Sequence, residues 1–293
     1  MSKKIDGKAA QEWAELGIKN FSDKKFQEAI NCFEKVTTLY PENASIWSNM
    51  GASYEFLGNF KKQIECCEKA TKIDPKNSEA WYNCGVGYDK LGKNKKSMGC
   101  YQKALELNPK DTHILINLGK LNLKAGNYQK AVECVEKAVK IDKQYTKAWK
   151  NLGLTYHKMN NHKKAVGAYN EFIKSNPKDS KTLYRLGMCH FHLRNDRKAI
   201  DFFKKATDID PKNGSAWNNL GFSLANMLKY DEALECYNKA IKCDSKDPNF
   251  WFNFAVTHNN MGNVEEAIKG FETVLKIEPK NTESKEYLKK LKR

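Results

Sequence analysis

Residues 214–247 read GSAWNNLGFSLANMLKYDEALECYNKAIKCDSKD, and residues of the same kinds recur along the chain with a step of 34 residues. A glycine marks the step best. It stands at Gly17, Gly51, Gly85, Gly119, Gly153, Gly187 and Gly221, and one step later it is replaced by Ala255. No insertion or deletion interrupts the series. A fixed period of this size is typical of a solenoid built from repeated structural elements.

Each repeat also carries a large residue before the glycine and a small and an aromatic residue after it. The large residue is Trp13, Trp47, Trp81, Leu115, Trp149, Leu183, Trp217 or Trp251. Apolar residues at helical spacing predict two helices per repeat. A proline closes most repeats, because it cannot donate the next backbone hydrogen bond of a helix. Gln63 and Ser97 stand where the small residue is expected, so we expect looser packing in the second and third repeats.

These markers, at these offsets, resemble the tetratricopeptide-repeat family. The resemblance implies an all-α, right-handed α-solenoid, a superhelix of eight helix-turn-helix repeats. The repeats run over residues 10–43, 44–77, 78–111, 112–145, 146–179, 180–213, 214–247 and 248–281. We expect residues 1–9 to be a flexible basic lead. Residues 282–293 are expected to form a helix that caps the last repeat, as a solenoid requires.

The composition restricts the class of protein. Hydrophobic residues make up 40% of the chain, and the sequence has no run of 18 or more apolar residues. We therefore expect no transmembrane helix, no signal peptide and a cytoplasmic location. Five of the nine cysteines, Cys32, Cys66, Cys100, Cys134 and Cys236, share one repeat position. Neighbouring helix axes lie about 8–10 Å apart, too far for a ladder of disulfides, so we expect buried thiols.

The resemblance also implies that the first helices of the repeats line a concave groove. One groove position holds asparagine in six of the eight repeats, at Asn49, Asn83, Asn117, Asn151, Asn219 and Asn253. An amide offers both a donor and an acceptor, so a row of amides can pair with the backbone of an extended peptide whatever its sequence. We predict that these asparagines form a peptide-binding row.

Charge in the predicted groove is uneven. Repeats four to six hold a basic patch, made of Lys120, Lys124, Lys147, Lys150, His157, Lys158, Lys181 and Arg185. Asn151, Lys181 and Arg185 resemble part of the clamp with which tetratricopeptide-repeat co-chaperones hold the acidic C-terminal tails of chaperones. The remaining part does not match, because Ile116 and Lys120 stand at its positions. The clamp is incomplete, and we predict a looser anionic-peptide site in the patch.

We interpret the chain as a non-enzymatic scaffold that binds an extended, acidic peptide segment of a partner protein. The repeats occupy 272 of 293 residues, which leaves too few for a catalytic domain, and we predict no catalytic residue and no cofactor. Cys189 and His192 share a helix face, but two ligands do not make a zinc site, so no metal is predicted.

Two alternatives stay open. The net charge of +16 permits binding of RNA or another polyanion. Glu55, Glu79 and Asp89 in the predicted groove disfavour that interpretation, because they would repel a phosphate backbone. Self-association through the repeat surfaces is the second alternative.

Overall fold

A computed structural model describes residues 4–5 and 8–292, and in this part of the chain it shows 17 helices and one pair of two-residue strands. The strands are β1 (Lys4–Ile5) and β2 (Lys8–Ala9). The first helices are α1 (Ala10–Ser22), α2 (Phe26–Leu39), α3 (Ala44–Phe56), α4 (Phe60–Ile73), α5 (Ser78–Lys90), α6 (Asn94–Leu107), α7 (Thr112–Lys124) and α8 (Tyr128–Ile141). They are followed by α9 (Thr146–Lys158), α10 (His162–Ser175), α11 (Ser180–His192), α12 (Asp196–Ile209), α13 (Gly214–Asn226), α14 (Tyr230–Cys243), α15 (Pro248–Asn260), α16 (Val264–Ile277) and α17 (Thr282–Leu291). The predicted all-α repeat fold is confirmed.

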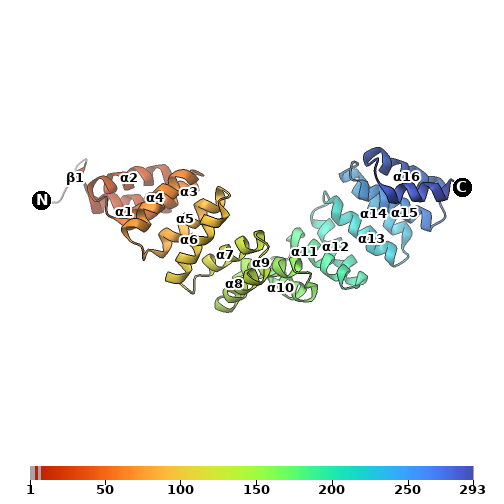
Figure 1. Cartoon of the computed structure of the whole chain (residues 1–293), viewed down its shortest axis with the longest axis horizontal. Helices are drawn as coiled ribbons and strands as arrows, with labels where there is room; N and C mark the ends of the chain where they lie inside the picture. Colours follow the sequence, from red (N-terminus) through yellow and green to blue (C-terminus); the bar gives the residue numbers. More distant parts are fainter. Residues whose placement is uncertain (1–3, 6–7, 293) are drawn as a thin grey trace. The chain divides into compact units, whose positions relative to one another are not determined.

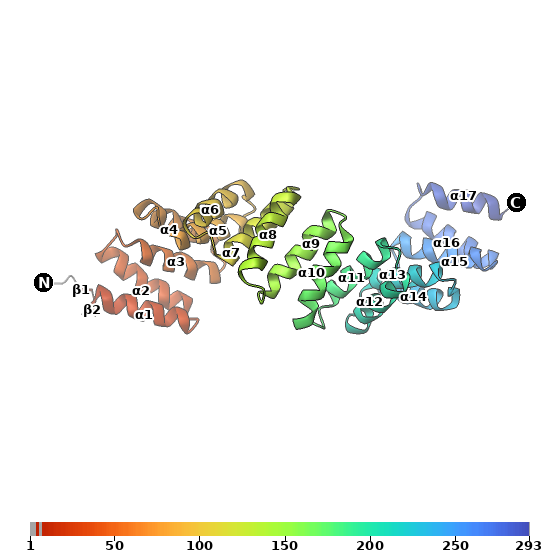
Figure 2. The same ribbon diagram turned by 90° about the horizontal axis from the view of Figure 1, so that it is seen from below.

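The chain divides into two compact units, a first unit (Met1–Ala148) and a second unit (Trp149–Arg293). Within each unit, consecutive helices pack side by side in the order of the sequence (Figures 1 and 2). Odd-numbered helices of one unit also contact each other, as α1 contacts α3 and α3 contacts α5 in the first unit and α11 contacts α13 in the second. The first helices of neighbouring repeats therefore form a continuous layer, and this layer presents the predicted groove residues. None of the described helices is both long and apolar enough to cross a bilayer.

Asparagine and aspartate side chains start most odd-numbered helices. Asn77 Oδ1 accepts a hydrogen bond from the Ala80 backbone N–H at 2.9 Å, and Asp179 Oδ1 accepts one from the Thr182 backbone N–H at 2.8 Å. Such a cap pairs one of the N–H groups that the first turn of a helix leaves without an internal partner. These caps fix where the first helix of a repeat begins.

In the first seven repeats the helix pair closes on a contact between the glycine of the first helix and a side chain of the second. A Cβ built on Gly153 would lie 2.4 Å from Tyr169 Cδ1, and one built on Gly17 would lie 2.5 Å from Phe33 Cε1. Tyr169 and Phe33 have no exposed surface. Glycine is required at these positions because any side chain would push the second helix away.

Gln63 and Ser97 do not loosen their repeats in the way we expected. Both side chains are fully buried. Gln63 Nε2 donates to the Asn83 carbonyl at 2.9 Å, and Ser97 Oγ donates to the Gly85 carbonyl at 2.6 Å. Both donors thus bind backbone carbonyls of α5, which offsets the cost of burying Ser97. For Gln63 the offset is partial, because its Oε1 is buried without a partner among the described residues.

Short elements cover both ends of the stack. Trp13 Nε1 donates to the Ile5 carbonyl at 2.9 Å, which attaches β1 to α1. The strands lie within the predicted N-terminal lead, whose residues 1–3 and 6–7 are outside the described residues. At the other end, the ring of Tyr287 stacks on Phe271 with centroids 4.6 Å apart, and Leu288 is buried. The helix α17 therefore packs on α16.

The glycine contact predicts the outcome of two matched substitutions in the second unit. Gly153→Ala should lower the free energy of unfolding by about 1–3 kcal/mol, because the new methyl group overlaps the Tyr169 ring. Gly167→Ala on α10 has no atom within 4 Å of the added Cβ and should be neutral or stabilising by up to about 1 kcal/mol. Chemical denaturation of the two variants measures the difference. Equal stability of the two variants would contradict the steric account.

Candidate functional site

A pocket of about 190 Å³ lies in the first unit, where the first helices of three repeats meet. Its lining residues are Ile18, Phe21, Phe33, Asn49, Ala52 and Glu79. They come from α1, α2, α3 and α5. The walls are mostly apolar, and one amide and one carboxylate stand at the edge. Such a composition suits an apolar side chain of a ligand together with hydrogen bonds to the ligand backbone.

Three phenylalanines extend the apolar surface beside this pocket. Phe21, Phe26 and Phe56, here called the phenylalanine trio, pack together, with the rings of Phe26 and Phe56 stacked at 4.6 Å and Phe21 edge-on to both at 5.5 Å. Phe56 is 62% exposed and Ile18 is 50% exposed. Exposed apolar surface of this kind marks interaction sites. The trio could not be predicted from the sequence, because its members come from three helices, although each is an aromatic residue at a helix end.

Most side chains of the asparagine row form hydrogen bonds between neighbouring repeats. Four of the amides donate to the residue 35 positions earlier, on the preceding first helix. The pairs are Asn83 with Ser48 Oγ at 3.3 Å, Asn117 with Tyr82 Oη at 3.3 Å, Asn219 with Tyr184 Oη at 2.9 Å and Asn253 with Asn218 Oδ1 at 2.9 Å. These amide donors therefore hold neighbouring repeats together.

Asn49 differs from those four asparagines. The residue 35 positions before it is Ala14, whose methyl group cannot accept a hydrogen bond. Among the described residues, no hydrogen bond from the Asn49 side chain is found, and this half-buried amide lines the pocket. Asn151 is also half-buried and lies on α9 in the second unit. Asn49 is thus the member of the row whose amide is best placed to meet a ligand in the first unit.

The predicted basic patch is distributed over both units. Lys120 lies on α7 in the first unit, whereas Lys150, Lys181 and Arg185 lie on α9 and α11 in the second. Lys181 is exposed and Arg185 is half-buried, and they are four residues apart on one helix. Such spacing puts the two cations on the same helix face.

Lys150 is held within the second unit. Its Nζ lies 2.6 Å from Asp179 Oδ2 and 4.8 Å from the centroid of the Phe172 ring. Asp179 also caps α11, as described above. Burial would raise the pKa of Asp179, but the hydrogen bonds from Lys150 and Thr182 and the positive charge of Lys150 bring it below its ordinary value. The charge of Lys150 is therefore largely matched by Asp179.

Lys120 has an excess of positive charge around it. Burial lowers the pKa of Lys120 below its ordinary value, and neighbouring lysines, Lys147 first, lower it further. Nearby Lys124 forms an ion pair with Asp89 at 2.8 Å. Asp89 offsets part of the repulsion, and an anion placed beside Lys120 would reduce it further.

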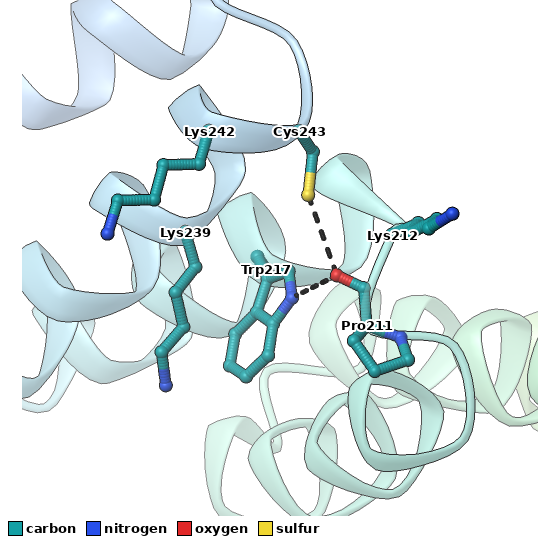
Figure 3. Close-up of a pocket in the computed structure, with 6 residues that line it drawn as sticks. All are labelled: Pro211, Lys212, Trp217, Lys239, Lys242 and Cys243. Carbon is teal, nitrogen blue, oxygen red and sulfur yellow. Dashed lines mark hydrogen bonds between the residues drawn. The ribbon is translucent and has the colours of Figure 1, made fainter.

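A larger hollow of about 570 Å³ in the second unit results from the packing of the repeat (Figure 3). Its lining residues are Pro211, Lys212, Trp217, Lys239, Lys242 and Cys243. Trp217 Nε1 donates to the Pro211 carbonyl at 3.0 Å, and Lys239 Nζ lies 4.4 Å from the Trp217 ring centroid. The second repeat has the same arrangement, with Trp47 bonded to Pro41 and Lys69 over the ring. A feature that recurs with the period is explained by the packing of the repeat.

Models of tetratricopeptide repeats match most of the chain. The middle TPR-like domain of cilia and flagella-associated protein 70 matches residues 72–176. Three further models, each described as a tetratricopeptide repeat, match residues 180–213 and 214–247, residues 236–269, and residues 44–77. No curated protein matches the sequence.

Three solved structures illustrate the proteins whose fold is similar to that of this chain. YrrB, titled a TPR protein with an unusual peptide-binding site, is 22% identical over 64% of this chain and 97% of its own, with a TM-score of 0.58. The MamA protein is 25% identical over 60% of this chain and 96% of its own, with a TM-score of 0.55. A tetratricopeptide repeat protein from Parabacteroides merdae is 17% identical over 85% of this chain and 99% of its own, with a TM-score of 0.58. These likenesses show a shared fold.

The two kinds of asparagine can be separated by substitution within the first unit. Asn117→Ala should lower the free energy of unfolding by about 1 kcal/mol, because it removes the hydrogen bond to Tyr82. Asn49→Ala should change it by less than about 0.5 kcal/mol, since this side chain makes no such bond among the described residues. Guanidinium unfolding of both variants measures the difference. A loss at Asn49 as large as that at Asn117 would show that the whole row is structural.

Proposed function

The chain belongs to the tetratricopeptide-repeat family, whose fold supports a protein-interaction scaffold, and we propose that it binds an extended, acidic peptide segment of a partner protein. The pocket lined by Ile18, Ala52 and Asn49 is the observation that carries this proposal, because it combines an exposed apolar anchor site with an amide that has no described partner. The proposed role is non-catalytic. The proposed location is the cytoplasm, because all nine cysteines are free thiols, the state that a reducing compartment maintains.

The pocket supports recognition of a single large apolar residue of the peptide. The ligand side chain would enter between Ile18 and Ala52 and rest against Phe21. The Asn49 amide would then bind the peptide backbone next to that residue, since an amide can donate and accept at once. This arrangement gives orientation from hydrogen bonds and most of the affinity from burial of apolar surface.

Acidic residues of the peptide would contact the lysines of α7 in the first unit. A carboxylate beside Lys120 would offset the repulsion from Lys147 and the other lysines described above. In the second unit, Lys181 and Arg185 offer a second pair of cations on α11. Lys150 contributes less, since Asp179 already pairs with it. This pairing also supports a looser anionic site over a complete chaperone clamp.

Binding of RNA or another polyanion has less support. Glu79 lines the apolar pocket. Glu55 is half-buried on α3, one helical turn after the pocket residue Ala52. These carboxylates would oppose a phosphate chain that followed the first helices. A polyanion complex would also weaken steeply with added salt. The apolar pocket supports the proposed peptide binding, and its apolar walls offer nothing to a phosphate backbone.

Filling the pocket should prevent peptide binding. Ala52→Arg places a long side chain in the cavity, and we expect it to weaken the best binder from a library of acidic peptides with one large apolar residue by at least about tenfold, or 1.4 kcal/mol. Gln102→Arg adds the same side chain at an exposed position of α6 and serves as the control. Fluorescence anisotropy measures both affinities. Unchanged affinity in Ala52→Arg would exclude the pocket as the anchor site.

The charge preference has a test of its own. Lys120→Glu should weaken acidic peptides by about tenfold and leave peptides with amides in place of the acids nearly unaffected, because only the former use the cation. Lys110→Glu makes the same change in net charge at an exposed turn residue and should have little effect. The double variant Lys181→Glu/Arg185→Glu applies the same comparison to α11. Equal losses for acidic and neutral peptides would remove the acidic preference and keep the scaffold.

A further inference from the structure

Three histidines and a cysteine of the second unit lie together at the ends of α9 and α11 and the start of α10. His157 is on α9, His162 is the first residue of α10, and Cys189 and His192 are on α11. His157 Nδ1 is 3.4 Å from Cys189 Sγ. Ligand atoms of His157, His162 and Cys189 all lie within 4.8 Å of one another. The ring of His192 stacks on that of His162 at a centroid distance of 4.4 Å.

This cluster has an apolar counterpart in the first unit. The phenylalanine trio stands 136 residues, or four repeats, before His157, His162 and His192, here called the histidine trio. In both trios the first two rings are edge-on, at 5.5 Å and 5.4 Å, and the second and third rings are stacked, at 4.6 Å and 4.4 Å. Ser53 stands at the position of Cys189. The same packing site is thus built once from phenyl rings and once from imidazoles with a thiol.

Packing alone does not account for the histidine trio. Phenyl rings fill the equivalent site without polar atoms, whereas His162 Nδ1 is buried and has no hydrogen-bond partner among the described residues. Leaving a buried polar atom unpaired costs free energy. Imidazole nitrogens in their neutral form bind metals. An added ligand on the imidazole nitrogens would remove the cost at His162.

We propose that His157, His162 and Cys189 bind one Zn²⁺ ion. Two imidazoles and a thiolate are ligands that Zn²⁺ prefers, and bond lengths of about 2.0–2.3 Å put the ligand atoms of a tetrahedral site roughly 3.3–3.7 Å apart. The nitrogen and sulfur of His157 and Cys189 already have this spacing. His162 closes the set by a small rotation at the start of its helix, and water takes the fourth position.

Binding of Zn²⁺ at this site is coupled to the loss of one proton from the protein. A cysteine thiol is largely protonated near pH 7, so Zn²⁺ must displace the proton of Cys189 when the Zn–S bond forms, and one proton is released to the buffer. Positive charges of Arg185 and Lys158 act on His157 and oppose a dication. The thiolate offsets one of the two charges of the ion. Binding would join α9 and α10 of one repeat to α11 of the next.

The test uses the full chain, kept reduced, and titrates it with Co²⁺ and then with Zn²⁺ in competition with a chromophoric chelator. We expect one equivalent of metal, a thiolate-to-Co²⁺ charge-transfer band, and release of one proton. Cys189→Ala should abolish the band and weaken Zn²⁺ binding by about 100-fold or more. Cys236→Ala removes another buried thiol of the same unit and should leave both unchanged.

A second variant keeps the test valid if Cys189→Ala does not fold. His162→Ala changes a half-buried residue at the first position of α10 and should keep the fold, as circular dichroism can check, while Zn²⁺ binding falls by a similar factor. Absence of the Co²⁺ band in the wild-type chain overturns the proposal. So does a band that survives Cys189→Ala, or Zn²⁺ affinity that is unchanged in folded His162→Ala.

Discussion

The close approach of two helix backbones inside each repeat is the constraint on which the rest of the structure depends. At Gly85 and Gly187 an added Cβ would lie within 2.6 Å of an aromatic ring, and at Gly119 the same space is taken by Val135. In the eighth repeat the glycine is replaced by Ala255, and Gly270 on α16 provides the space, since a Cβ there would lie 2.7 Å from that of Ala255. The requirement is steric, and the chain meets it from either helix.

The fold could be predicted from the sequence as far as it depends on the contacts between the two helices of one repeat. The two helices of a repeat follow from local spacing, and the glycine, the aromatic residue and the cap all lie within one period. The hydrogen-bond partners of the asparagine row could not be predicted in the same way. Whether Asn117 faces a ligand or Tyr82 depends on a residue 35 positions away on another helix. Sequence spacing places both on the same layer but does not tell which of them the amide binds.

The basic patch and the apolar pocket show the same limit. Spacing in the sequence places Lys150 in one patch with the other lysines, whereas in the structure Asp179, the cap of a later helix, neutralises it. The pocket beside the phenylalanine trio is lined by side chains from four helices, so the amphipathic pattern of a single helix does not predict it. Cys189 and His192 were considered on their own helix, and the two histidines that complete the cluster lie 27 and 32 residues before the cysteine. Each of these features is a property of several helices together.

A strict repeat nevertheless offers a criterion for function that a less regular fold lacks. The same position meets nearly the same packing in each repeat, so a residue that follows the period is explained by packing. The tryptophan, proline and lysine around the hollow in Figure 3 recur in this way and need no ligand. Asn49 departs from the rule because Ala14 replaces the acceptor that other asparagines find. The histidine trio departs from it because imidazoles replace phenyl rings in an unchanged geometry. In both places the helices pack as in other repeats and a polar group is left without a described partner, and these are the places where we propose that the chain binds a ligand.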